Sequence, residues 1–197
     1  SSVKTDNVPN DQEPLRKKDF NDTNFFEILS SSKKPVIIAG TLAVRKGWSE
    51  WLNKLSVPVF SVASAKGVVD ETLKHSAGVY TGAGLELTPE LSILPESDLI
   101  ICLGLRHKEV LNVKPFHCAS INIDPLGNSY SSGFVFDSII EGTGVEVDQL
   151  YSLLVEKGWG IELLEECNVK MRKHMLSSTF LPSDAFMILE EHFRHRA

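Results

Sequence analysis

The sequence has little of what marks several large classes of protein. Its three cysteines, Cys102, Cys118 and Cys167, are far apart and form no CxxC pair, so neither a disulfide framework nor a cysteine zinc site is indicated. We expect all three to be buried as small hydrophobic side chains. No apolar run approaches the ~20 residues that span a bilayer, and a net charge of -6 offers nucleic acid no basic surface. These absences predict a cytoplasmic globular protein that binds neither nucleic acid nor membrane.

Common catalytic motifs are missing as well. The sequence contains no GxSxG, no HExxH and no P-loop, so it nominates no catalytic residue and no metal ligand. Gly40 and Gly47 are too far apart for a GxGxxG turn, which argues against a standard NAD site. A sirtuin-like deacetylase would need four zinc-binding cysteines, and three dispersed ones argue against it.

What the sequence does contain is a series of short apolar runs separated by helical patterns. The runs expected to be strands are 35–40, 57–62, 97–104, 119–125 and a short candidate at 138–142, and the helices are expected at 24–29, 48–55, 87–96 and 144–157. The first and third runs are apolar throughout, as in strands buried on both faces. The pattern predicts an α/β fold: a doubly wound, mainly parallel sheet with helices on both faces, and these two strands adjacent at its centre. We expect six strands in all, one more than the five runs identified here.

Two of the expected loops have a distinct composition. The loop that contains Arg45, Lys46 and Gly47 leads into a helix with Trp48 and Leu52 on one face. Residues 78–84 hold three glycines in seven positions, which would let the backbone approach either a ligand or another chain segment.

The chain divides into three parts. Residues 1–32 are expected to be a linker with a lead-in helix, residues 33–160 the central α/β domain, and residues 161–197 a helical C-terminal part. The last helix, 185–196, carries Phe186, Leu189 and Phe193 on one side. We expect this apolar stripe to fold back on its own domain or to pair with another copy, which favours a homo-oligomer.

In open α/β sheets, ligands bind beyond the carboxyl ends of the strands. Gly40, Arg106 and Asp124 follow three of the expected strands and are our candidates for cofactor binding. Arg106 could pair with a phosphate; the alternative is that it is solvated surface, as we expect for His107. Asp124 stands where dinucleotide folds place a ribose-binding carboxylate, or it begins a simple Asp-Pro turn.

Five segments taken together resemble one known family. Residues 35–40, 65–71, 78–82, 97–106 and 121–125 resemble, in order and spacing, the central domain of thiamine-diphosphate-dependent enzymes. The second and third segments look most like pyruvate and indolepyruvate decarboxylases, and the last two look more like acetolactate synthases. The resemblance covers about residues 33 to 157 and implies a nucleotide-binding-like (DHS-like) fold. It also implies partner domains on both sides, a pyrimidine-binding and a diphosphate-binding domain, and residues 181–185 resemble the start of the latter.

The same resemblance implies the cofactors. Thiamine diphosphate and magnesium would be held by the partner domains, since the Gly-Asp-Gly metal motif does not occur here, and this chain alone would be inactive. The parent would be a lyase or transferase. In acetolactate synthases the middle domain binds FAD, and Gly40, Arg106 and Asp124 would face that nucleotide. Here Thr41-Leu42-Ala43 replaces a glycine cluster and Thr143 replaces an expected Asp, so we do not expect bound FAD. The alternative is a stand-alone nucleotide-binding or subunit-interaction module of the same fold.

Overall fold

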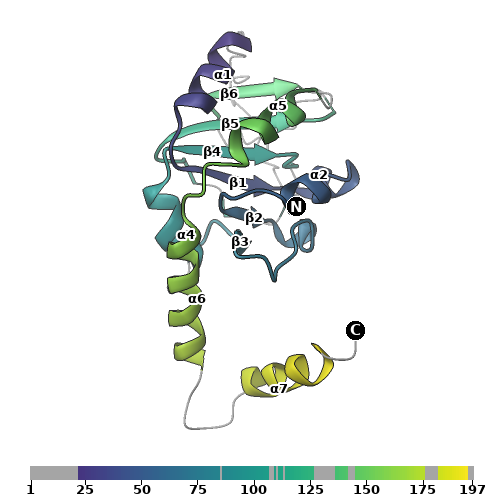
Figure 1. Cartoon of the computed structure of the whole chain (residues 1–197), viewed down its shortest axis with the longest axis vertical. Coiled ribbons are helices and arrows are strands. Elements are labelled where there is room, and N and C mark those ends of the chain that lie inside the picture. The colour runs from purple at the N-terminus through teal and green to yellow at the C-terminus, as the bar shows by residue number, and fades with distance from the viewer. Residues whose placement is uncertain are drawn as a thin grey trace, which may run out of the picture.

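The computed structural model describes residues 22–84, 86–106, 109, 111–112, 114–126, 136–141, 145–175 and 182–194. A single parallel sheet forms its centre (Figure 1). Its strands are β1 (Pro35–Ala39), β2 (Val59–Ser61), β3 (Ser76–Val79), β4 (Leu99–Leu103), β5 (Ala119–Asp124) and β6 (Ser138–Glu141), in the order β3-β2-β1-β4-β5-β6. Every neighbouring pair is parallel, which confirms the predicted α/β class.

β1 and β4 lie side by side at the centre of the sheet, as predicted. They pair in register from Pro35 with Leu99 to Ala39 with Leu103. Every residue of both strands is buried, because helices or loops cover both faces of a parallel sheet. Burial of each large aliphatic side chain, such as Ile37 or Ile101, contributes ~1.5–3 kcal/mol.

Helices connect the strands and cover the sheet, and two more follow at the C-terminal end of the chain. They are α1 (Asp22–Ser31), α2 (Thr41–Arg45), α3 (Ser49–Leu52), α4 (Pro89–Ile93), α5 (Val145–Leu154), α6 (Ile161–Met175) and α7 (Pro182–Arg194), with short 3-10 turns η1 (Ala63–Ala65) and η2 (Leu94–Glu96). Trp51 of α3 meets Tyr151 of α5 with ring centroids 6.4 Å apart, and α1 contacts α5, so these three helices share one face. The connections from β1 to β2 and from β2 to β3 run towards one edge of the sheet, whereas the connection from β3 through α4 to β4 runs back across it. Because crossovers are right-handed, α4 then lies on the opposite face of the sheet.

Two segments that were expected to be loops are a strand and a helix in the structure. Residues 76–79 form the edge strand β3, where a glycine-rich loop was expected from residue 78. Gly78 has a positive φ, and the pairing with β2 shifts register there. The side chains of this strand therefore do not alternate regularly between the two faces of the sheet. Residues 41–45, expected in a loop, form α2. The helix expected at 48–55 is reduced to the four residues of α3, although Leu52 is buried as predicted.

The three cysteines differ in how deeply they are buried. Cys102 and Cys167 are buried, but Cys118 is only half-buried, so that expectation was wrong for one of the three. Its Sγ lies 3.6 Å from the Ser97 hydroxyl, near the amino ends of β4 and β5.

Within the described residues, no helix has the length and apolar character needed to cross a bilayer.

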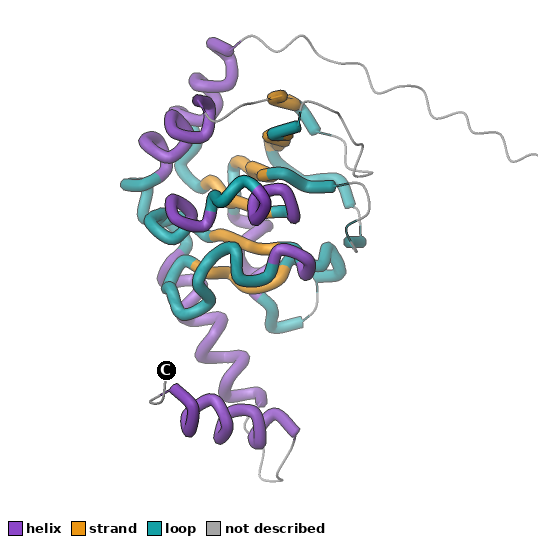
Figure 2. The backbone as a smooth tube through the Cα atoms, turned by 90° about the vertical axis from the view of Figure 1, so that its right-hand side faces the viewer, coloured by secondary structure: helices purple, strands orange, loops and turns teal. Residues whose placement is uncertain are grey.

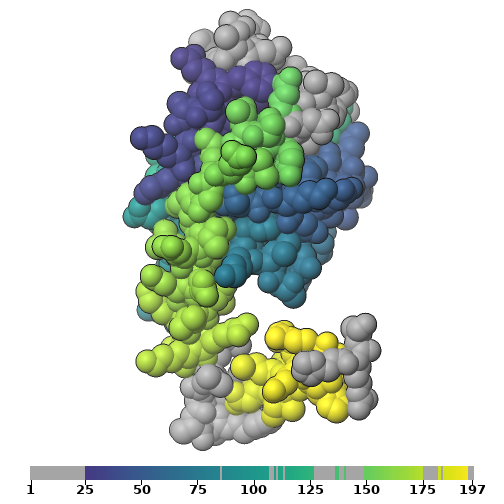
Figure 3. Space-filling model, in the orientation of Figure 1, coloured from purple at the N-terminus to yellow at the C-terminus, as the bar shows by residue number. Residues whose placement is uncertain are grey.

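The C-terminal helices extend away from the sheet (Figures 1 and 2). The first half of α6 is anchored by buried Leu164 and Cys167, and it packs on α4. The predicted apolar stripe on α7 is solvent-exposed: Phe186 is 72%, Leu189 49% and Phe193 57% exposed, and the helix lies apart from the sheet in the space-filling view (Figure 3). The expectation that this stripe folds back on its own domain was therefore wrong.

Candidate functional site

The carboxyl ends of β1 and β4 form the switch point of the sheet, because the chain leaves β1 towards β2 on one side and β4 leads to β5 on the other. Gly40 follows β1 and Gly104 follows β4. The Gly40 N–H donates to the Leu103 carbonyl at 2.8 Å. A Cβ added to Gly40 would lie 2.5 Å from the Gly104 oxygen, and one added to Gly104 would lie 2.7 Å from the Leu42 Cβ. The two segments therefore touch backbone to backbone, and glycine is needed at both positions.

The start of α2 uses its own backbone donors within the chain. The Leu42 N–H donates to the Gly104 carbonyl at 3.1 Å, and the Ala43 N–H donates to the Gly40 carbonyl at 3.0 Å. The Thr41 N–H donates to the Glu109 carboxylate at 2.6 Å. Together with the Gly40 amide, the N–H groups of four consecutive residues, 40–43, all donate hydrogen bonds to acceptors within the chain.

Glu109 is a site residue that sequence reasoning missed. Its Oε1 accepts the Thr41 amide hydrogen, while its Oε2 is buried and has no hydrogen-bond partner among the described residues. From the sequence, only Arg106 and His107 were considered in this stretch. A glutamate five positions beyond a glycine carries no local signal, because its target amide lies 68 residues away in the chain.

Arg106 and Asp124 lie at the same edge as Gly40, as predicted. Arg106 is half-buried, and its carbonyl accepts the Glu109 N–H at 3.3 Å. Asp124 is only 4% exposed, and its Oδ1 accepts the Leu126 N–H at 2.9 Å, an Asx turn that closes the Asp-Pro corner. The geometry of Asp124 thus agrees with the simple turn. His107 and Thr143 lie outside the described residues.

The glycine-rich segment after β3 meets another part of the chain. The Asn112 N–H donates to the Thr81 carbonyl at 2.9 Å, and a Cβ on Gly82 would overlap the Asn112 carbonyl. The buried Glu90 carboxylate accepts the Thr81 N–H, the Thr81 hydroxyl at 2.9 Å and the Gly84 N–H at 3.1 Å. Of the two alternatives, a ligand or a chain segment, contact with the chain's own residues is what the structure contains.

The titratable groups inside the sheet are unsuited to acid–base or nucleophilic chemistry. Burial raises the pKa of the Cys102 thiol well above its ordinary value and raises the pKa of Tyr80, so both stay protonated. Burial lowers the pKa of His75, whose Nε2 donates to the Leu52 carbonyl at 2.9 Å. Asp98 lies at the opposite, amino edge, where its carboxylate accepts the Ser32 hydroxyl at 2.6 Å. These groups hold the fold together.

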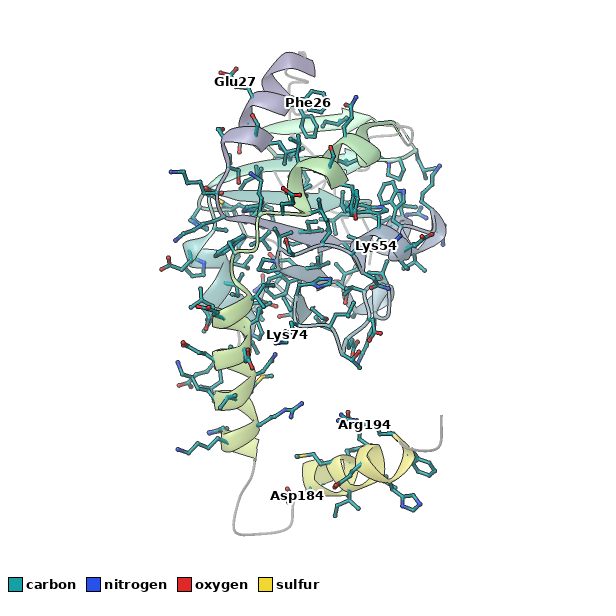
Figure 4. The ribbon with its side chains drawn as sticks, viewed as in Figure 1. Phe26, Glu27, Lys54, Lys74, Asp184 and Arg194 are labelled. Atoms are coloured by element: carbon teal, nitrogen blue, oxygen red, sulfur yellow. The ribbon has the colours of Figure 1, made fainter. Side chains whose placement is uncertain are left out.

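Metal and small-molecule sites are equally scarce in the part of the chain that is described. No three His, Cys, Asp or Glu side chains there could hold a metal ion together. An open depression of about 290 Å³ lies between α1 and α5, lined by Phe26, Gln149, Ser152 and Leu153. Figure 4 labels Phe26 on α1, away from the switch point. The described residues do not fit a diphosphate-bound metal.

This chain is similar to one protein family and to several individual proteins. Residues 23–131 match the family model described as "Thiamine pyrophosphate enzyme, central domain". A pyruvate decarboxylase of Aspergillus terreus is 33% identical over 100 residues, which cover 49% of this chain and 17% of that protein. Two solved structures are similar in fold. One, from Mycobacterium smegmatis, is described as a thiamin diphosphate-dependent enzyme (TM-score 0.48, 21% identity, 66% of this chain and 27% of that one). The other is benzoylformate decarboxylase from Polynucleobacter necessarius (TM-score 0.49, 15% identity, 78% and 30%).

Proposed function

Because this chain belongs to the family of thiamine pyrophosphate enzyme central domains, we propose that it is the central domain of a thiamine-diphosphate-dependent 2-oxo-acid decarboxylase or acetolactate-synthase-like enzyme. Its own role is structural. The observation that carries the proposal is the family match over residues 23–131, which spans β1 to the end of β5. The similarity to a pyruvate decarboxylase favours the decarboxylase over the synthase.

The proposal assigns the chemistry to other domains of the parent enzyme. A thiamine enzyme needs a carboxylate at the cofactor's pyrimidine and a magnesium ion at its diphosphate, and the described residues offer no metal site. We propose that a pyrimidine-binding and a diphosphate-binding domain supply these groups. In this arrangement residues 1–32 are a linker, 33–160 the central domain, and 161–197 the connection to the diphosphate-binding domain. The parent would be a cytoplasmic lyase or transferase.

An activity assay tests the assignment. The purified chain is incubated with thiamine diphosphate, magnesium and pyruvate, and carbon dioxide release is compared with a protein-free control. We expect no release above the control. Release that scales with protein concentration would contradict the proposal, because this chain would then hold a complete active site. Sequencing the gene on both sides separates the proposal from the alternative of a stand-alone module: coding sequence for the two partner domains is expected in the same reading frame.

A further inference from the structure

Doubly wound α/β folds commonly bind a nucleotide at the switch point, and that binding has two structural requirements. Diphosphates bind at a helix start through backbone N–H groups that point at the phosphate oxygens without another partner. The backbone must also leave room for the phosphate to approach closely. Both requirements can be examined at Gly40 and α2.

The first requirement fails because the donors are already used. The amides of Gly40, Leu42 and Ala43 donate to carbonyls at 2.8–3.1 Å. The remaining amide, Thr41, donates to Glu109 Oε1 at 2.6 Å, a short distance typical of a charge-assisted hydrogen bond. A phosphate oxygen would need the same hydrogen atom and the same position. Glu109 thus stands where the phosphate would have to be.

The second requirement is not met at Gly40, because the backbone after β4 lies directly against it. A single Cβ on Gly40 would come within 2.5 Å of the Gly104 oxygen and 2.7 Å of the Leu105 Cα. These are backbone atoms, so side-chain rotation cannot relieve the overlap. The Thr41 hydroxyl is also tied to the Ser64 hydroxyl at 2.8 Å, which links the loop after β2 to the same point. At this point the segments after β1 and β4 leave no room even for a methyl group.

We infer that Glu109 closes the switch-point crevice from within, and that this domain therefore excludes dinucleotides and flavins from the position where this fold class binds them. The carboxylate acts as an internal substitute for the phosphate: it satisfies the helix amide, and its negative charge repels an incoming anion. It also fixes the segment that follows β4 against α2. The inference concerns only the carboxyl edge of this domain, so it holds or fails independently of the parent enzyme's activity.

Amide hydrogen exchange and nucleotide titration of the full chain test the inference. FAD and ADP are added separately at millimolar concentration to the isotope-labelled protein, and the amide signals of Gly40, Thr41 and Leu42 are followed. We expect neither nucleotide to shift these signals. In Glu109→Ala, exchange of the Thr41 amide should accelerate about ten-fold or more, as loss of a charge-assisted hydrogen bond implies. Glu109→Gln keeps an acceptor and should give a smaller acceleration. Glu86→Ala, which removes an exposed glutamate, is the matched control and should change nothing.

Two results would overturn the inference. One is a saturable shift of the Gly40 or Thr41 amide signal with FAD or ADP in the unmodified chain. The other is a Thr41 amide that exchanges as fast in the unmodified chain as in both Glu109 variants, because Glu109 would then not protect it. If Glu109→Ala does not fold, Glu109→Gln and the nucleotide titration still decide the question. Neither result bears on carbon dioxide release, so this inference and the proposed function fail separately.

Discussion

Glu90 provides a sharp test of how the carboxyl edge is held together. It is 5% exposed, and its two carboxylate oxygens accept three hydrogen bonds from the segment after β3. Thr81 donates to Oε1 through both its N–H and its hydroxyl, and the Gly84 N–H donates to Oε2 at 3.1 Å. Every partner is a donor, so a carboxylate suits the position and an amide does not.

The change to make is Glu90→Gln. Glutamine has nearly the same shape, but one of its two terminal atoms is an NH2 group. If the amide oxygen stays with Thr81, the NH2 group faces the Gly84 N–H, and that hydrogen bond is replaced by a contact between two donors. The two hydrogen bonds from Thr81 remain, but their acceptor is now neutral. A hydrogen bond to a charged group contributes about 1.5–3 kcal/mol, and a buried donor left unpaired costs about 1–3 kcal/mol. We expect the free energy of unfolding to fall by about 3 kcal/mol.

Urea unfolding and thermal melting followed by circular dichroism measure the effect. A loss of about 3 kcal/mol corresponds to a decrease in Tm of roughly 6–12 °C for a domain of this size. Glu86→Gln, an exposed glutamate on the same loop, is the matched control and should change stability by no more than about 0.5 kcal/mol. If Glu90→Gln were as stable as this control, the three hydrogen bonds would not hold the loop, and Glu90 would not be one of the residues that stabilise this edge.

Two further perturbations follow from other parts of the fold. Because burial lowers the pKa of His75 from 6.5, the unfolded chain binds a proton at a higher pH than the folded chain does; stability should therefore be greatest above pH 6.5 and fall as the pH drops towards the folded-state pKa. His75→Gln should reduce this slope in urea unfolding at a series of pH values, and an unchanged slope would show that other groups cause it. The exposed stripe of Phe186, Leu189 and Phe193 should pair with a second copy, since burial contributes ~1.5–3 kcal/mol per large side chain. Sedimentation with and without residues 181–197 should then show a dimer only in the longer form, and identical behaviour would refute the pairing.

The centre of the sheet could be predicted from the sequence because its signal is local. Residues 36–38 and 99–103 are apolar without interruption, and only strands covered on both faces tolerate such runs. The helix expected at 87–96 is present as α4: Thr88 before it is extended and Pro89 takes the first helical position, where proline is common.

The features missed by sequence reasoning depend on contacts distant in the chain. α2 is five residues long, too short to be stable by itself, and Gly104 and Glu109 complete its first turn from the other side of the switch point. β3 was missed because its four residues include Gly78 in a positive-φ conformation. Gly40, Arg106 and Asp124 were placed at the correct edge, since strand ends are local features. Glu109, which acts there on a distant amide, could not be found in this way.

The segment after β4 links these contacts into one structure. Gly104 accepts a hydrogen bond from Leu42, Glu109 binds the Thr41 amide, and Asn112 donates to the Thr81 carbonyl. Gly104 and Glu109 therefore contact the loop after β1, and Asn112 contacts the loop after β3, although these two strands are not neighbours in the sheet. In a ligand-binding α/β domain, a nucleotide joins such loops. Here the chain joins them by itself, so hydrogen bonds within the chain hold the carboxyl edge together.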